Sequence, residues 1–214
     1  MSAPTSAPPP GLPRAQEVLD FWFGPDPQSP AHFTQRLHQW FGGDDPPEVI
    51  AERDALVTSR FRPLMDEAAA GALDHWAGSP HRLLALVLLL DQFPRHVYRG
   101  RARAYAQDSR ALAFTLHALT TGADATLSLA ERLFLYLPLQ HAESAAMQEE
   151  SIAAYRRLLA DAPAPNRKLF ESVLEFALQH QSVVARFGRV PHRNAALSRR
   201  STPEELEFLS TPAT

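Results

Sequence analysis

Eight consecutive apolar residues, residues 83–90, run directly into a cluster of polar and charged side chains that extends to Gly100. An apolar run of this kind is typical of a buried core element. Its position after Ser79 and Pro80 predicts a helix that begins at Pro80, with Ser79 as its N-cap. Pro94 predicts that the helix ends there, because the residue before a proline disfavours the α conformation.

The rest of the chain shows helical periodicity from Arg14 onward. Prolines inside two of the patterns, at Pro63 and Pro138, predict a kink or break in each. Capping boxes at residues 128–131 and 201–204 predict two helix starts. The predicted helices cover residues 18–23, 32–41, 47–65, 80–93, 104–121, 143–160 and 166–187, with one from 128 interrupted at Pro138 and a short one that ends at 209.

No run combines strict alternation with β-branched residues, so the sequence predicts no strands. Seven to ten helices joined by short turns imply antiparallel neighbours, as in a helical bundle or a solenoid-like array. No internal period is visible, so the residues themselves do not predict a repeat protein. The 214 residues suit one domain, expected over residues 14–210 between a disordered Pro/Ser-rich tail at residues 1–13 and a short tail at residues 211–214.

Composition excludes several classes of function. The chain has no cysteine, which excludes disulfides, thiolate catalysis and Cys-type zinc sites. A net charge of −3 gives no bulk argument for binding nucleic acid or membranes. No apolar run approaches the ~20 residues of a membrane span, and residues 1–13 lack the regions of a signal peptide. We therefore expect a cytoplasmic protein with no membrane partner.

Basic residues concentrate in two segments of this acidic chain. Residues 81–110 hold six arginines and two acids, and residues 181–214 hold five arginines and three acids. Each segment contains a corner marked by proline or glycine, where a core element delivers polar groups to the surface. Their shared charge is the first indication that the two corners belong to one site.

At the first corner, Asp91 falls near the C-terminal end of the apolar helix, where the helix dipole disfavours a carboxylate. Asp91 therefore needs a cationic partner, and Arg95 or Arg99 is the obvious one. Two interpretations stay open. The structural one is a partly buried ion pair that holds the corner. The functional one is an anion or polar-ligand site built from Arg95, His96 and Arg99 and oriented by Asp91 and Gln92.

The second corner carries four groups that are or can become cationic, together with one amide. These residues are Arg186, Arg189, His192, Arg193 and Asn194. So many like charges repel unless acids or a bound anion neutralise them. The glutamates of the final helix, Glu204, Glu205 and Glu207, are the internal candidates, and an anionic ligand is the alternative.

Between the corners, residues 131–144 embed polar groups in a stripe of leucine and aromatic side chains. Such groups must find partners when they are buried. The residues expected to line a pocket here are Tyr136, Gln140, His141 and Glu143, joined by Asp91 and His180.

Signals of catalysis are weak. The sequence has no nucleophile elbow, no P-loop and no G-x-G-x-x-G motif. His141 and Glu143 are spaced poorly for shared metal ligation, and His-Glu-x-x-His is absent, so we expect no metal and no cofactor. A His–carboxylate acid–base pair stays open. Its candidate members are Asp91, His141, Glu143, His180 and His192.

Five separated motifs resemble, in the same order, those of the mainly bacterial domain of unknown function 924 family. They are VLDFWFG (18–24), Trp40 with Phe41, LALVLLLDQFPRHVYRG (84–100), ERLFLYLPLQHAES (131–144) and ARFGRVPHRNAALSRRSTPEELEFL (185–209). The resemblance covers roughly residues 15–210. It implies an all-helical fold similar to tetratricopeptide-like right-handed superhelices, built from antiparallel helix pairs, and it implies no particular activity.

Three positions depart from the usual residues of that family. Gln140 stands where glutamate is common, Ala142 where serine is usual, and Ser198 where glycine is usual. A carboxylate that did acid–base or metal chemistry at position 140 would be lost here, whereas a purely structural hydrogen bond would survive the change.

We therefore predict one all-α domain that binds a small anionic ligand or an acidic peptide where the two corners meet. The residues expected to contact the ligand are Gln92, Arg95, Arg99, Tyr136, Arg186, Arg189, Arg193 and Asn194. One alternative is a metal-independent hydrolase or lyase that uses the acid–base pair in the same pocket. The other is a purely structural network at helix ends. Basic corners without exposed aromatic platforms argue against nucleic acid, and the oligomeric state stays open.

Overall fold

The computed structural model describes residues 12–24, 36, 40 and 45–211. Within these ranges the chain forms α-helices and short 3₁₀ turns and no strand, which confirms the predicted all-α class. The helices are α1 (Leu12–Phe23), α3 (Pro47–Ala69), α4 (Pro80–Val97), α5 (Asp108–Thr121), α6 (Leu129–His141), α7 (Ala145–Asp161), α8 (Arg167–Phe187) and α9 (Pro203–Ser210). The helix predicted over residues 32–41 and the predicted tails lie outside the described residues, apart from residues 12, 13, 36, 40 and 211.

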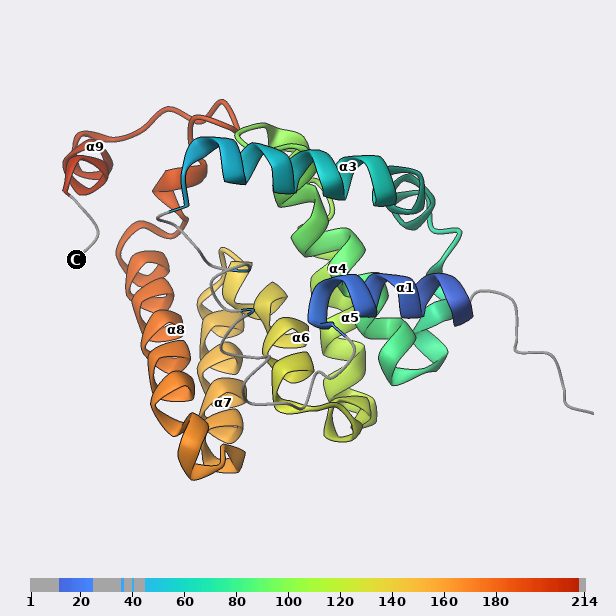
Figure 1. Cartoon of the computed structure of the whole chain (residues 1–214). Helices are drawn as coiled ribbons and strands as arrows, with labels where there is room; N and C mark the ends of the chain where they lie inside the picture. The colour runs from blue at the N-terminus through green and yellow to red at the C-terminus, as the bar shows by residue number, and fades with distance from the viewer. Residues whose placement is uncertain (1–11, 25–35, 37–39, 41–44, 212–214) are drawn as a thin grey trace, which may run out of the picture.

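Helices that follow one another along the chain also pack on one another. Contacts join α3 to α4, α4 to α5, α5 to α6, α6 to α7 and α7 to α8, while α1 packs against α4. In Figure 1, α6, α7 and α8 run side by side, α3 crosses one end of the molecule, and α9 lies beyond the end of α8. Short connections between neighbours, such as residues 142–144 between α6 and α7, make those neighbours antiparallel. The right-handed tetratricopeptide-like array stays a prediction.

Helix α4 is the central element of the core. Every residue from 83 to 90 is buried, because α4 is covered by α1, α3, α5 and α6. The helix begins at Pro80 after Ser79, as predicted, although the Ser79 side chain makes no capping hydrogen bond. A helix that is apolar on all faces is stable only when it is surrounded in this way.

The end of α4 differs from the prediction. The helix continues through Pro94 to Val97, and the amide of Tyr98 still donates to the Pro94 carbonyl at 2.9 Å. Pro94 is itself buried, so packing on the neighbouring helices outweighs the helical hydrogen bond that proline removes. As a result, Asp91 and Arg95 lie one turn apart on the same helix.

The other two internal prolines also fail to break their helices. α3 runs unbroken through Pro63, and α6 runs unbroken through Pro138. In α6 the prediction was wrong for the same reason as in α4, because residues 133–140 are all buried against neighbouring helices. Because α6 is continuous, its last residue, His141, lies beside Asp91 near the C-terminal end of α4.

Two helix starts are set by capping boxes. Ser128 Oγ accepts a hydrogen bond from the Glu131 amide (3.4 Å), and Glu131 accepts one from the Ser128 amide (2.8 Å), as predicted. At α9 the box is formed by Thr202 and Glu205, one residue later than predicted. Pro203 explains the shift, because proline suits the first helical position and leaves Thr202 as the N-cap.

The segment predicted as one helix over residues 104–121 is divided. A 3₁₀ turn, Ala102–Tyr105, precedes α5, which begins at Asp108. Gly122 and Gly188 end α5 and α8 in the left-handed conformation (φ 69° and 67°), as their positions predicted. The division matters for the site, because the 3₁₀ turn packs against α4.

Aromatic residues from α4 and from four other segments meet in the core. The closely packed rings are those of Phe21, Trp22, Phe23, Trp40, Phe61, Phe93 and Phe134. Most pairs meet edge-on or tilted, the geometry that aromatic quadrupoles favour. None of the helices in the described ranges is long and apolar enough to cross a membrane.

Candidate functional site

Asp91 is the first polar residue after the apolar run of α4, and it is completely buried. Its carboxylate accepts hydrogen bonds from Gln92 and from Nδ1 of His141 (2.8 Å) and lies 3.3 Å from the guanidinium of Arg95. Burial opposes ionisation, but the Arg95 charge and the partners of the carboxylate hold the pKa of Asp91 well below its usual range. Asp91 is therefore a negative charge inside the core.

His141 is oriented by this carboxylate. An ionised carboxylate can only accept, so Nδ1 of His141 carries the proton and donates it to Asp91. Burial lowers the pKa of His141, and the positive charge of Arg95 lowers it further. The ring is thus neutral near pH 7, with a lone pair on Nε2, which has no hydrogen-bond partner among the described residues. The side chain keeps 15% of its surface exposed.

Asp108 joins the two basic corners. Both of its oxygens accept hydrogen bonds from Arg95, at 3.0 Å each, and one lies 3.3 Å from Nη1 of Arg193. The guanidinium groups of Arg95 and Arg193 both face the ring of Tyr105, at 5.5 and 4.9 Å from its centre. Such cation–π contacts keep the two arginines in place. The corners that the sequence analysis singled out therefore meet in space.

The two arginines of this cluster are not equally neutralised. Arg95 bonds to both oxygens of Asp108 and to the carbonyl of Asp91 (2.6 Å), and it also faces the Asp91 carboxylate. Among the described residues Arg193 makes a single long hydrogen bond, although a guanidinium has five N–H donors. Burial, together with the like charge of Arg95, lowers the pKa of Arg193 in spite of Asp108. Arg193 is therefore a charged group with unused donors.

His180 of α8 forms another wall of the same region. Its Nδ1 lies 3.0 Å from the carbonyl of Phe176 and 3.3 Å from the amide of Gln140. A carbonyl can only accept, so Nδ1 is protonated and donates to Phe176. The amide of Gln140 is placed with Nε2 towards the ring, and it accepts from the same N–H when it is turned to present its oxygen. Burial lowers the pKa of His180, and the positive charge of Arg193, joined by that of His141 when it is protonated, lowers it further. His180 is thus neutral, with Nε2 free to accept a hydrogen bond.

The rest of the second corner is neutralised internally. Arg189 makes two hydrogen bonds to Glu205 (2.6 and 2.7 Å), and the buried Asn194 amide donates to the same carboxylate (3.2 Å). Bonds from Arg189 and from the first turn of α9 lower the pKa of Glu205 to about 2. Arg186 pairs with Glu204 at the surface (2.8 Å). These contacts tie α9 to the corner.

Glu143 also has a structural partner set. It makes two hydrogen bonds to Arg199 (2.6 and 2.9 Å) and accepts the backbone amide of Val190 (2.8 Å). Burial opposes ionisation, but Arg199 and the amide lower the pKa of Glu143. His192 is exposed and packs edge-on against Phe208. Neither residue contacts the Asp91–His141 pair.

Three of the residues named from the sequence lie elsewhere. Arg99 and His96 both bind Asp54 of α3, with contacts of 2.7–2.8 Å, instead of Asp91. Tyr136 is fully buried and donates to Asp124 (2.6 Å), and burial raises the pKa of Tyr136 to about 12. The hydroxyl of Tyr136 is fully used, and Arg99 and His96 are paired with Asp54 of α3 and not with the Asp91 site.

Sequence reasoning missed Asp108 and Tyr105, which hold the two arginines together. One signal pointed to Asp108, since it is the second of only two acids in the basic segment of residues 81–110. No local signal pointed to Asp54 or Arg199, whose partners lie 42 and 56 residues away. Within the described ranges, no three histidine or acidic side chains are grouped so that they could hold a metal ion.

The chain is similar to proteins whose function is equally open. The family model described as bacterial protein of unknown function (DUF924) matches residues 18–213. A solved structure of a protein of unknown function from Agrobacterium tumefaciens shares 36% sequence identity and a TM-score of 0.73, over 92% of this chain and 97% of that one. Comparison with curated proteins gives no match. The activity must therefore be argued from the site.

Proposed function

Because the chain belongs to this family of bacterial proteins of unknown function, we propose a function from its own side chains: it binds a small anionic ligand between Arg193, His141 and His180. One observation carries the proposal. Arg193 is a partly buried guanidinium, 12% exposed, that uses one of its donors, and its charge lowers the pKa of both His141 and His180. Buried charges are normally paired more completely.

The chemistry of these groups favours a carboxylate or phosphate oxygen as the ligand atom. The planar guanidinium fork matches such oxygens with two parallel hydrogen bonds. A histidine beside the bound anion gains a proton and becomes a second cation, which strengthens the contact. The small exposed surface of Arg193 favours a small ligand or a chain terminus over a folded partner.

The site is smaller than the arginine-rich pocket expected from the sequence. Arg95, Arg99, Arg186 and Arg189 are each neutralised by an acid of the protein. For those four residues the structural alternative, in which charges hold helix ends, is the better supported one. Asp91 and Gln92 act on the site indirectly, because they orient His141 and Arg95.

Isothermal titration and thermal unfolding with inorganic phosphate and acetate test the proposal. Binding to the folded state raises the unfolding temperature with ligand concentration. Arg193→Gln removes the fork and is expected to weaken binding about tenfold or more, since a hydrogen bond to a charged group contributes about 1.5–3 kcal/mol. Arg193→Lys keeps the charge but loses the planar fork, so it should fold normally and bind with intermediate affinity.

Arg99→Gln is the matched control, because Arg99 is an exposed arginine of the other basic segment and pairs with Asp54, away from Arg193. It should leave anion binding unchanged. The proposal is wrong if neither anion binds, or if Arg193→Gln binds as tightly as the unmodified protein while circular dichroism confirms its fold.

Acid–base catalysis is a second candidate, and the Asp91–His141 pair favours it. Asp91 fixes the ring so that Nε2 is the accepting nitrogen, and the lowered pKa keeps His141 neutral near pH 7. These are the properties of a general base in a hydrolase or lyase. Arg193 would then hold the charge of the substrate.

A panel of p-nitrophenyl esters and phosphates tests this candidate. His141→Gln should abolish any turnover, and Arg99→Gln should preserve it. Turnover that survives His141→Gln would contradict the assignment. Binding of anions without any turnover would leave the protein as a binding module.

A further inference from the structure

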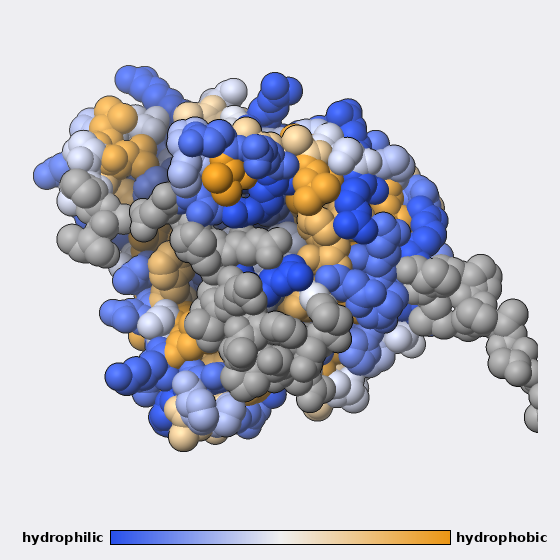
Figure 2. All heavy atoms as spheres, in the orientation of Figure 1, coloured by the Kyte–Doolittle hydropathy of each residue, from blue (hydrophilic) through white to orange (hydrophobic). Residues whose placement is uncertain are grey.

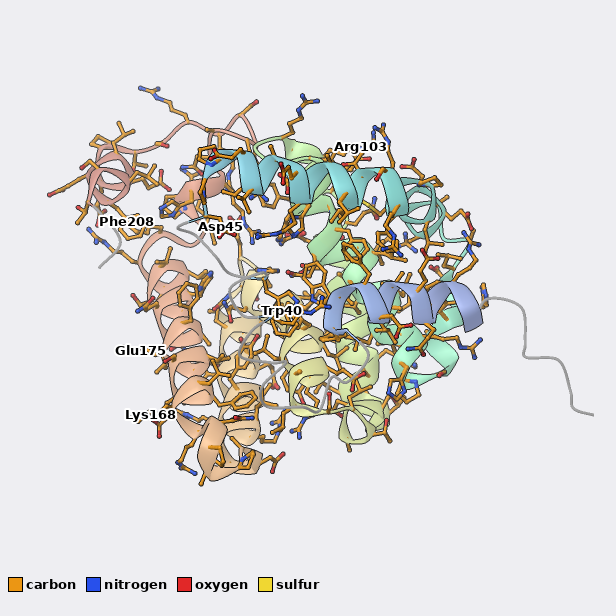
Figure 3. All side chains as sticks on the ribbon, viewed as in Figure 1. Trp40, Asp45, Arg103, Lys168, Glu175 and Phe208 are labelled. Carbon is orange, nitrogen blue, oxygen red and sulfur yellow. The ribbon has the colours of Figure 1, made fainter. Side chains whose placement is uncertain are left out.

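A groove of about 530 Å³ lies between the second half of α8 and the short helix α9. Phe176 and Val183 of α8 and Phe208 of α9 line it with apolar surface. Figure 2 shows apolar surface along α8 and on α9, and Figure 3 places Phe208 on the side of α9 that faces α8. The rings of Phe187 and His192 hold Phe208 there, at 5.1 and 5.5 Å between centres.

The groove contains aromatic surface that is exposed to solvent and is not packed into the core. Phe176 is 59% exposed although its ring packs on His180, with 5.5 Å between centres. A single exposed apolar residue is ordinary, but apolar residues that line a groove beside polar groups are typical of ligand sites.

His180 connects the groove to the anion site. It lines the groove, and it also bonds to Gln140, the residue before His141 at the end of α6. His192, which lines the groove as well, directly precedes Arg193 in a 3₁₀ turn, so the apolar groove and the partly neutralised guanidinium lie next to each other. A ligand that bridges them needs a negative head and an apolar body.

We propose that the ligand is a small amphipathic monoanion, a carboxylate with an aliphatic or aromatic chain of several carbons. Its head would contact Arg193 and the two histidines, and its chain would lie along Phe176, Val183 and Phe208. This inference rests on the proposed anion site and names the class of ligand that it takes. Charge complementarity selects the head, and the apolar walls select the tail.

Titration calorimetry with acetate, butanoate, hexanoate and octanoate tests the tail. Each methylene that enters the groove should raise affinity by up to about fourfold, until the groove is filled. Phe176→Ser should remove most of this dependence on chain length and leave acetate binding unchanged. Leu178→Ser is the matched control, because Leu178 is also exposed on α8 (40%) but does not line the groove.

The outcomes separate the tail from the head. Acetate binding that depends on Arg193, with no gain from longer chains, would overturn the groove and leave the anion site standing. Octanol that binds as tightly as octanoate, with no effect of Arg193→Gln, would overturn the anionic head. Equal effects of Phe176→Ser and Leu178→Ser would mean that the groove is not where the chain lies.

Discussion

Single residues set the protonation state of the site. Gln140 is a departure from the family resemblance, and it retains the structural hydrogen bond to His180, because its amide oxygen can accept as a carboxylate oxygen does. The change from the usual glutamate removes a negative charge that would favour protonated His180. The lowered pKa of His180 agrees with this neutral surrounding.

Ser198 is the non-glycine residue with a positive φ among those described, at 53°. Glycine is the usual residue at this position by resemblance, and a left-handed conformation costs an L-residue about 1 kcal/mol. We expect Ser198→Gly to stabilise the protein by only about 0.5 kcal/mol, because the relief of this strain is partly offset by the freedom that glycine gains in the unfolded chain. Urea denaturation measures the change. Ser198→Ala is the control, and a gain as large as that of glycine would contradict this reason.

Among the elements, α6 has the most demanding position, because it is buried along residues 133–140 and must deliver His141 to Asp91. Its start is set by the capping box at Ser128, so the register of the whole helix depends on that end. The start of α9 is fixed in the same way by the capping box at Thr202, and the ion pair between Arg189 and Glu205 holds α9 to the second corner.

Ser128→Ala should lower the free energy of unfolding by about 1 kcal/mol, since the cap satisfies an amide at the start of α6. Ser172→Ala on the exposed face of α8 is the matched control, because its hydroxyl bonds only to the Lys168 carbonyl one turn earlier. It should change stability by less than about 0.5 kcal/mol. Equal losses in urea denaturation would show that the cap contributes nothing specific.

At the scale of the whole molecule, ion pairs join segments that are far apart in sequence. Arg193 and Asp108 are 85 residues apart, and the pairs of Asp54 hold α3 to α4. These pairs involve partly buried groups, so salt screens them less than it screens exposed pairs. Three histidines, His96, His141 and His180, have lowered pKa values, and the first two face carboxylates in such pairs.

We expect the unfolding temperature to fall in two stages as the pH is lowered. The three histidines ionise near pH 6.5 when unfolded but at lower pH when folded, so the unfolded chain binds more protons and stability declines from about pH 7 downward. Asp54 and Glu143 have lowered pKa values, so the stability that they contribute is lost below about pH 4.

Calorimetry between pH 8 and 3 measures both stages. Bound anions should reduce the fall in unfolding temperature in the first stage, because they favour the protonated form of His141 in the folded protein. His141→Gln should reduce the first stage and preserve the second. An unfolding temperature that stays constant from pH 8 to 5.5 would contradict the buried, neutral state of the histidines.

The amino-acid sequence determined the helical class, the buried α4 and most helix ends, because periodicity, caps and glycine stops act over a few residues. It also placed Asp91 beside Arg95 and predicted that the two basic corners belong together. Tertiary structure decided which acid meets which base: Asp108 binds Arg95 and Arg193, Asp54 takes Arg99, and Glu143 takes Arg199. Local pattern cannot choose among such partners, since a long arginine side chain pairs with whichever carboxylate the packing of distant helices brings within reach. The same packing keeps three helices continuous at their internal prolines, and it leaves several N–H donors of Arg193 without an acceptor among the described residues.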